Sequence, residues 1–278
     1  MKINANAKIN LTLDILGVRE DGFHALRSVM VPVTLCDELV IEKSESLVFD
    51  CNIKELCTTD NLCVRAAKLF FATLGTDNSA SIYLKKNIPF PAGLGGGSAD
   101  AAAVLKGLNE LYGNQLDRKL LFSLAERLGS DVPLCLLGSA ALCEGRGEEL
   151  TPLSNLPTLD LVIAIGKSRL STPEVYRRYD AAKLPVRNDS ERFISALASG
   201  SCELASLLGN AFEPVTDILA PETKLLREEM LTSGALNARL SGSGPSVYGV
   251  FKNESEAQLA AEKLKNMGYF AISCRTIA

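Results

Sequence analysis

A glycine-dense loop followed directly by a strong helix former is the feature that most constrains this 278-residue chain. The loop covers residues 91–97, where successive glycines allow a ligand to approach the backbone closely. A helix is predicted from about Ser98 to Gly113, because its apolar residues recur on one face. The N–H groups of the loop and the unpaired N–H groups of that helix together suit a phosphate. The alternative interpretation is a glycine turn that binds nothing, because short glycine motifs also occur without ligands.

Two common phosphate-binding motifs do not fit this loop. A Rossmann fingerprint that starts at Gly93 and Gly95 needs its third glycine where Ser98 stands. A Walker A loop ends in Gly-Lys-Ser or Gly-Lys-Thr, and no lysine follows these glycines. The later segment Gly166-Lys167-Ser168 lacks the first glycine of that motif, since Leu161 occupies its position. The loop is therefore predicted to be a phosphate cradle of another kind.

Composition excludes several classes of function. The net charge is −4 and no run of lysine and arginine stands out, which argues against nucleic acid as a partner. The eight cysteines form no C-x-x-C pair and His24 is the sole histidine, so the spacing of zinc ligands is absent. Neither a signal peptide nor an apolar stretch of about 20 residues occurs, which predicts a cytoplasmic protein with reduced thiols and no membrane partner. With one histidine, general-base chemistry falls to a carboxylate or a lysine unless it is built on His24.

The first fifteen residues alternate between apolar and polar side chains, which predicts a half-buried strand. Lys8 and Asn10 project from its polar face, and asparagine is depleted from ordinary strands. A polar face of this kind suits the lining of a cleft, although a solvated strand surface gives the same pattern.

Farther along the chain, strands and helices mix without regular alternation, which predicts an α+β architecture and not a doubly wound sheet. Strands are expected at residues 29–33, 39–42, 47–51, 81–84, 159–165 and from 270, with a strand–turn–strand at 238–251. Helices are expected after an Asp60 cap, near Asp117 and over 255–267, whereas Pro133 is expected to block a helix at Val132. The segment 150–157 is rich in proline, serine and asparagine, which predicts a boundary between domains 1–155 and 156–278.

Three segments carry candidate chemistry. Asp131 lies in a loop after a helix and is the leading candidate base, the alternative being a turn aspartate that bonds its own backbone. Lys8 is its candidate partner, because a nearby cation keeps a carboxylate ionised and stabilises a developing alkoxide. The segment Ser241-Gly242-Ser243-Gly244 offers N–H and hydroxyl donors or forms a plain hairpin turn. Phe23 and His24 lie on one turn, as a platform for stacking on a base or as a purely structural pair.

Five segments in a fixed order carry a resemblance that spans nearly the whole chain. They are Ala7-Lys8-Ile9-Asn10-Leu11, Asp21-Gly22-Phe23-His24, residues 91–102, Gly129-Ser130-Asp131-Val132-Pro133 and Leu240-Ser241-Gly242-Ser243-Gly244. The chain resembles the GHMP kinase superfamily and, within it, the branch that acts on 4-(cytidine 5′-diphospho)-2-C-methyl-D-erythritol. The glycine loop marks only the superfamily, whereas the N-terminal segments and Gly-x-Asp-Val-Pro are much more specific.

The resemblance implies a two-domain α+β GHMP kinase fold, with an N-terminal half like domain 2 of ribosomal protein S5 and the active site in the cleft between the halves. It implies phosphorylation of the 2-hydroxyl of that substrate by ATP with Mg²⁺, in the non-mevalonate route to isoprenoid precursors. The expected assembly is a monomer or a weak homodimer. The alternatives are a sibling kinase that acts on homoserine, mevalonate or a sugar, and a nucleotide-binding module without catalysis.

The resemblance also assigns individual residues, with Lys8 and Asp131 matching the catalytic pair. The positions expected to bind ATP are Pro89, Phe90, Pro91, Ala92, Gly93, Leu94, Gly95, Gly96, Gly97, Ser98 and Ala99, with Asn61 and Lys86 near the nucleotide. The positions expected to bind the cytidylyl substrate are Asn10, Phe23, His24, Tyr176, Ser241, Gly242, Ser243 and Gly244, the last four closing over the phosphates. Phe23 replaces the more usual tyrosine, and Ala99 stands where many members have a second serine, so the metal ligands stay unassigned.

Overall fold

The computed structural model describes residues 1–201 and 203–277, so Cys202, one of the thiols predicted to be reduced, lies outside the described residues. The chain divides into two compact units, each assembled from separate stretches. Unit 1 comprises residues 1–8, 35–89 and 95–138, and unit 2 comprises residues 9–34, 90–94 and the chain from residue 139 onward. The single boundary predicted at residue 155 stays a prediction.

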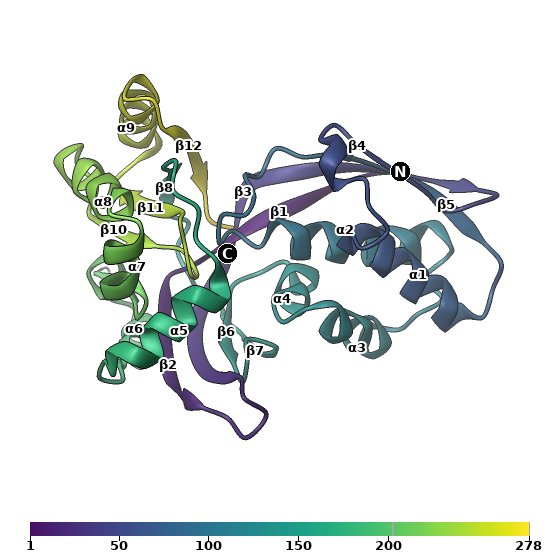
Figure 1. Cartoon of the computed structure of the whole chain (residues 1–278), viewed down its shortest axis with the longest axis horizontal. Helices are drawn as coiled ribbons and strands as arrows, with labels where there is room; N and C mark the ends of the chain where they lie inside the picture. Colours follow the sequence, from purple (N-terminus) through teal and green to yellow (C-terminus); the bar gives the residue numbers. More distant parts are fainter. Residues whose placement is uncertain (202, 278) are drawn as a thin grey trace. The chain divides into compact units, whose positions relative to one another are not determined.

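Unit 1 is a small sheet with helices packed on it (Figure 1). Its strands are β1 (Lys2–Asn10), the later part of β3 (His24–Ser44), β4 (Val48–Cys51) and β5 (Ser79–Lys85). Its helices are η1 (Lys54–Leu56), α1 (Leu62–Leu74), α2 (Gly96–Leu111), α3 (Arg118–Leu128) and α4 (Val132–Leu137). The strand order is β4-β5-β3, and β1 pairs with β3. Apolar side chains of α1 and α2 bury against Ile41 and Ile82 of the sheet, and this burial is the main stabilisation of the unit.

Helix α2 lies unusually close to the sheet because its inner face is made of small residues. Three consecutive alanines, residues 101–103, are buried there, and a Cβ on Gly107 would lie 2.7 Å from Ile41 Cδ1. The helix begins at Gly96, two residues before the predicted start, because Gly95 adopts a left-handed conformation as its N-cap. The Ala99 N–H donates to the Gly95 carbonyl at 2.9 Å, which closes the first turn directly on the glycine loop. The loop is therefore continuous with the helix.

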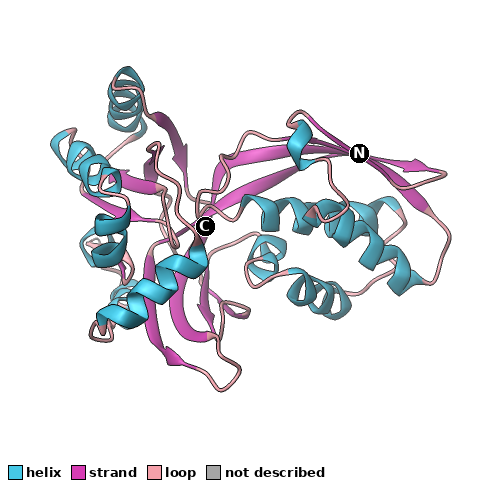
Figure 2. Ribbon diagram, in the orientation of Figure 1, coloured by secondary structure: helices cyan, strands magenta, loops and turns pink. Residues whose placement is uncertain are grey.

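Unit 2 contains a four-stranded antiparallel sheet in the order β10-β11-β8-β12, on which α8 and α9 pack (Figures 1 and 2). Outside this sheet, β2 pairs with the first part of β3, β9 with β2, and the β6–β7 hairpin with β3. The elements of this unit are β2 (Thr12–Val18), β6 (Ala141–Glu144), β7 (Glu149–Pro152), β8 (Asp160–Ile165), α5 (Thr172–Ala182), α6 (Asp189–Ala198), η2 (Leu204–Leu207), β9 (Gly209–Asn210), α7 (Glu213–Leu219), α8 (Glu222–Thr232), β10 (Asn237–Leu240), β11 (Val247–Phe251), α9 (Glu254–Asn266) and β12 (Phe270–Arg275). Across the described residues, no helix combines the length and the apolar character needed to span a membrane.

Two strand predictions were wrong. The strands expected at 29–33 and 39–42 form one continuous strand, β3, and the polar stretch between them finds partners beyond the strands. Asp37, for example, is fully buried and accepts the backbone N–H groups of Asn87 and Ile88 at 2.6 and 2.7 Å. The N-terminal strand was predicted to be half-buried, but Lys8 and Asn10 on its polar face are only 5% and 1% exposed. It also ends at Asn10, and the chain resumes as β2 at Thr12.

Two helix predictions were also wrong at their first residues. Asn61, and not Asp60, caps α1, because the Asn61 side chain accepts the Cys63 N–H at 2.9 Å. Pro133 does not block a helix but lies in the first turn of α4. A proline is tolerated there because the N–H groups of a first turn have no partner within the helix.

Candidate active site

Lys8 and Asp131 form an ion pair within unit 1. The Lys8 Nζ lies 3.4 Å from Asp131 Oδ2, with the Lys8 side chain 6% exposed and the Asp131 side chain 31% exposed. Asp131 is the N-cap residue of α4, yet its side chain makes no hydrogen bond that caps this helix. Among the described residues at the start of α4, the Asp131 side chain therefore does not bond its own backbone, as the turn-aspartate alternative requires. The pair combines a buried cation with a carboxylate that solvent or a ligand can reach.

The glycine loop is the reason that Lys8 can extend toward Asp131. Gly95 has φ +65° and ψ +17°, the left-handed region that favours glycine. A Cβ on Gly95 would lie 2.8 Å from Lys8 Cγ and 3.1 Å from Lys8 Cε, so a larger residue would displace the lysine stem. The loop and the ion pair are thus packed directly against each other at the N-terminus of α2.

Lys86 lies beneath the same turn of α2. A Cβ on Gly96 would lie 3.0 Å from Lys86 Nζ, which places the amine against the first residue of the helix. The amine is buried and pairs with Asp37 and, at 2.7 Å, with Asp100 Oδ2. Burial alone would lower the pKa of Lys86, but the charges of Asp100 and Asp37 outweigh it and hold that pKa above its usual value. Lys86 is therefore a fixed positive charge at the loop.

The second glycine cluster packs on the first part of the loop within unit 2. The Ser241 Oγ donates to the Gly93 carbonyl at 3.1 Å, and the Ser246 N–H donates to the Ala92 carbonyl at 3.3 Å. Gly93 has φ +73°, and a Cβ there would lie 2.5 Å from the Ser241 carbonyl oxygen. The sequence allowed residues 241–244 to be either a set of donors or a plain hairpin turn. In the structure they form a turn that holds residues 92 and 93 in place.

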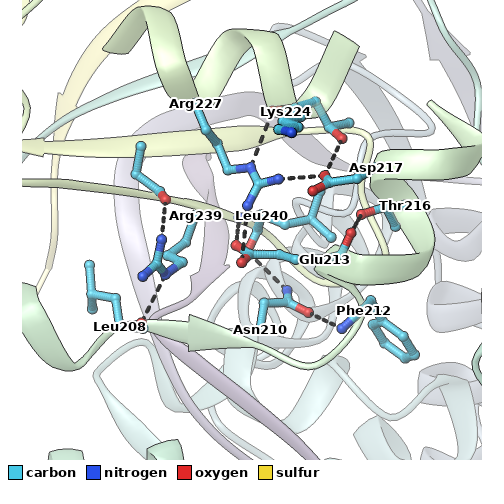
Figure 3. A network of polar contacts seen from close by, with 12 residues as sticks. Leu208, Asn210, Phe212, Glu213, Thr216, Asp217, Lys224, Arg227, Arg239 and Leu240 are labelled. Atoms are coloured by element: carbon cyan, nitrogen blue, oxygen red, sulfur yellow. Dashed lines mark hydrogen bonds and ion pairs between the residues drawn. The ribbon is translucent and has the colours of Figure 1, made fainter. Parts of the chain in front are cut away.

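A buried polar network holds the turn of residues 241–244 (Figure 3). The Asn210 Nδ2 donates to the carbonyls of Leu240 and Gly242, both at 2.9 Å. Glu213 Oε1 accepts the Leu240 N–H at 3.1 Å and its other oxygen pairs with Arg227 at 3.0 Å. Because each polar group of this network named here has a partner, these bonds hold the turn at low energetic cost.

Asn10 lies beside this turn. Its Nδ2 donates to Ser28 Oγ at 2.8 Å, its carbonyl accepts the Tyr248 hydroxyl at 3.0 Å, and a Cβ on Gly242 would lie 3.6 Å from its Oδ1. Asn10 is 1% exposed, so it is a firmly bound part of unit 2.

His24, Tyr176 and Asp180 form a cluster in unit 2. The ring centroids of His24 and Tyr176 are 4.6 Å apart with the planes inclined by 37°. The His24 Nε2 lies 2.7 Å from Asp180 Oδ1 on the next turn of α5. Phe23 is 55% exposed, and the guanidinium carbon of Arg146 lies 5.1 Å from its ring centroid. The cluster presents aromatic and imidazole faces together with an accessible ring.

The other predicted loop residues divide by exposure. Leu94 and Ala99 are 1% and 2% exposed, so both residues are buried. Asn61 is occupied at the start of α1, where its Nδ2 also donates to the Leu56 carbonyl at 2.9 Å. A Cβ on Gly97 would lie 3.5 Å from Leu62 Cδ1, so the start of α1 adjoins the first turn of α2. Pro89, Gly97 and Ser98 belong to unit 1, whereas Phe90, Pro91 and Leu94 belong to unit 2.

Sequence reasoning missed Asp37, Asp100, Arg146 and Asp180. Asp100 carried a usable signal, because it is a lone charge within the alanine-rich start of α2. Asp37 and Asp180 carried no such signal in the sequence. The partner of Asp37 is 49 residues away along the chain, and that of Asp180 is 156 residues away. Within the described part of the chain, no group of three or more histidine, cysteine, aspartate or glutamate side chains could hold a metal ion.

Comparison with known proteins decides the family. Residues 61–139 match the GHMP kinases N terminal domain, and residues 187–269 match the GHMP kinases C terminal domain. The 4-diphosphocytidyl-2-C-methyl-D-erythritol kinase of Caldicellulosiruptor bescii is 42% identical over 95% of this chain and 94% of its own length. That of Symbiobacterium thermophilum is 43% identical over the full length of both chains. The chain belongs to the 4-diphosphocytidyl-2-C-methyl-D-erythritol kinase family.

Solved structures agree with membership of this kinase family. A crystal structure of 4-(cytidine 5′-diphospho)-2C-methyl-D-erythritol kinase superposes with a TM-score of 0.87 at 36% identity, covering all of both chains. The homoserine kinase of Cytophaga hutchinsonii has a TM-score of 0.73 at 20% identity, covering all of this chain and 94% of that one. That second likeness shows the shared fold alone. The predicted GHMP kinase fold and the predicted family are confirmed.

Proposed function

We propose that this chain transfers the γ-phosphoryl group of ATP to the 2-hydroxyl of 4-(cytidine 5′-diphospho)-2-C-methyl-D-erythritol, giving the 2-phosphate and ADP. The observation that carries the proposal is the Lys8–Asp131 pair, 3.4 Å apart, packed against the glycine loop of a chain from this kinase family. A module that only binds a nucleotide has no need of a carboxylate paired with a buried lysine beside its phosphate loop.

The reacting groups are assigned to unit 1. Asp131 takes the proton of the 2-hydroxyl while the oxygen of that hydroxyl bonds to the γ-phosphorus. In the same step, the bond from that phosphorus to the bridging oxygen of ADP breaks. Lys8 stabilises the negative charge that develops on the attacking oxygen. The N–H groups of residues 95–98 hold the phosphates at the positive end of α2. Lys86, paired with Asp37 and Asp100, lies beneath that turn, and Asn61 lies near the nucleotide.

The substrate-binding groups are assigned to unit 2. Phe23 and Tyr176 are assigned to stacking on the cytosine ring, His24 and Asn10 to hydrogen bonds with the substrate, and the turn of residues 241–244 to phosphate contacts. The tight packing of that turn on Gly93 supports this assignment, because phosphate contacts require fixed donors.

Mg²⁺ would enter with ATP, because this ion is held chiefly by substrate phosphates and water. The described residues suit that route, since they offer no ready-made cage of metal ligands. When bound, Mg²⁺ offsets negative charge on the β- and γ-phosphates. A cytoplasmic location, the absence of a nucleic-acid partner and a monomeric or weakly dimeric state stay predictions of the sequence.

The proposal is tested by ADP release with ATP, Mg²⁺ and each of four acceptors: the cytidylyl substrate, mevalonate, homoserine and galactose. We expect turnover with the cytidylyl substrate alone. Turnover with another acceptor instead would keep a GHMP kinase but overturn the substrate. ATP binding without turnover on any acceptor would favour a binding module.

Asp180→Asn is expected to weaken binding of the cytidylyl substrate. A carboxylate can only accept, so the Asp180 side chain accepts a hydrogen bond from His24 Nε2 and fixes the orientation in which the imidazole meets the substrate. The amide of asparagine can donate or accept, which removes that constraint. Because Asp180 is about half exposed, we expect KM for this substrate to rise about fivefold, with kcat nearly unchanged.

The matched control for this variant is Glu174→Gln on the same helix. Glu174 is an exposed carboxylate whose partners are Arg177 and Arg178, so its loss removes a similar surface pair away from His24. We expect its steady-state constants to equal those of the native protein. Equal KM values for Asp180→Asn and Glu174→Gln would contradict the proposed role of Asp180.

A further inference from the structure

Two carboxylates share one ammonium group beneath the first turn of α2. Lys86 Nζ donates to Asp37 Oδ2 and to Asp100 Oδ2, and all three side chains are at least nine-tenths buried. If both acids are ionised, the cluster carries a net charge of −1. A buried uncompensated charge is costly, and this one lies under the turn that is proposed to receive the phosphates of ATP.

The two carboxylates differ in their partners, which identifies the one that can hold a proton. Asp37 accepts the backbone N–H groups of Asn87 and Ile88 at Oδ1 and the Lys86 amine at Oδ2. Among the described residues, Asp100 accepts from Lys86 alone, and its buried Oδ1 has no hydrogen-bond partner. An unpartnered oxygen costs less on a neutral carboxyl than on a carboxylate. Asp100 is therefore the carboxyl that is suited to exchange a proton.

The surroundings of Asp100 favour its neutral form. Burial and the charge of Asp37 together raise its pKa to about 7, against the opposing effect of Lys86. The other titratable groups that face it are the thiols of Cys51 on β4 and Cys63 on α1. Burial raises the pKa of both thiols, that of Cys63 by a large amount, so neither contributes a charge near neutral pH.

We infer that Asp37 and Asp100 are positioning residues that hold Lys86 against the first turn of α2, and that Asp100 takes up a proton when nucleotide phosphates bind there. The physical cause is the added negative charge of the phosphates, which disfavours a second nearby carboxylate. The proton neutralises the cluster without loosening Lys86, because Asp37 still holds the amine. This inference rests on the proposed function, since it requires a nucleotide at this turn.

The expected size of the uptake follows from the pKa of about 7. At pH 8 roughly one Asp100 in ten is protonated in the free protein, and a rise in pKa of about one unit on binding would bring this to about one half. We expect about 0.4 proton to be taken up per ADP bound at pH 8. At pH 6 the free carboxyl is already about nine-tenths protonated, so we expect an uptake below about 0.1 from this group.

The experiment measures the heat of binding of ADP with Mg²⁺ to the full chain at pH 8, in two buffers of different ionisation enthalpy. ADP suits this pH because the second pKa of a phosphate is about 6, so its own titration contributes little. Native protein is expected to take up about 0.4 proton, and Asp100→Asn to take up none. The control Asp50→Asn removes an exposed carboxylate of unit 1 whose pKa is held below its usual value by Lys54, and it should match the native protein.

The outcomes separate this inference from the proposed function. ADP binding without proton uptake at pH 8 would overturn the inference and leave the kinase assignment intact, whereas the absence of any ADP binding would count against the proposed function itself. If Asp100→Asn does not fold, carbon-13 NMR of the aspartate carboxyls in native protein decides the point. One carboxyl should titrate near pH 7 and move to higher pH with ADP, and titration of every carboxyl below pH 5 would overturn the inference.

Discussion

Replacement of Asp131 by asparagine is expected to lower kcat by about 10² to 10⁴-fold, the usual contribution of a general base. Asparagine keeps the shape of the side chain but cannot take the proton of the acceptor hydroxyl. Because the native side chain does not cap α4 and is about a third exposed, the fold should be retained, with a change in unfolding free energy below about 1 kcal/mol. Single-turnover ADP formation with saturating ATP and cytidylyl substrate measures the loss directly.

Asp117→Asn is the matched control for that experiment. Asp117 is also an N-cap residue of unit 1, and its side chain accepts the Leu120 N–H at 2.8 Å. Asparagine caps a helix about as well as aspartate, so both stability and kcat should stay at their native values. An Asp131→Asn protein that turns over at a nearly native rate would remove Asp131 as the base.

The chemistry near the glycine loop was predictable because its signals are local in sequence. The loop marks a phosphate cradle by glycine density alone, and the structure places Gly95 and Gly96 at the first turn of α2, where N–H groups are unpaired. The Lys8–Asp131 pairing came from chemical requirement and family resemblance, and the 3.4 Å contact agrees with it. Their catalytic roles stay predictions until turnover is measured.

What the sequence could not predict depends on contacts between distant segments. Alternation in the first strand indicated one polar face open to solvent or a cleft, but neighbouring strands and loops bury both faces around Lys8 and Asn10. In the same way, Asp37 reads as a polar break in a strand until residues 86–88 are seen to donate to it. Periodicity reports which faces of one element are apolar, and it carries no information about polar partners supplied by another element.

Gly95→Ala is expected to lower kcat by about 10²-fold, a typical cost of moving a reacting group by about 1 Å. Two effects act at this position. The left-handed conformation with φ +65° costs an alanine about 1 kcal/mol in stability, and the new Cβ would lie 2.8 Å from Lys8 Cγ. Because that contact is too short, the lysine stem must shift, and its amine moves relative to Asp131.

Gly75→Ala separates the two effects. Gly75 ends α1 with φ +63°, nearly the same conformation as Gly95, but nothing lies within 4 Å of the position its Cβ would take. Both variants should lose about 1 kcal/mol in urea unfolding, and only Gly95→Ala should lose kcat. A higher KM for ATP with a native kcat in Gly95→Ala would show that the methyl group obstructs the phosphates and leaves Lys8 in place. A fall in kcat in Gly95→Ala alone, with Gly75→Ala at the native rate, would identify the close packing of the loop on Lys8 as the feature that aligns the catalytic pair.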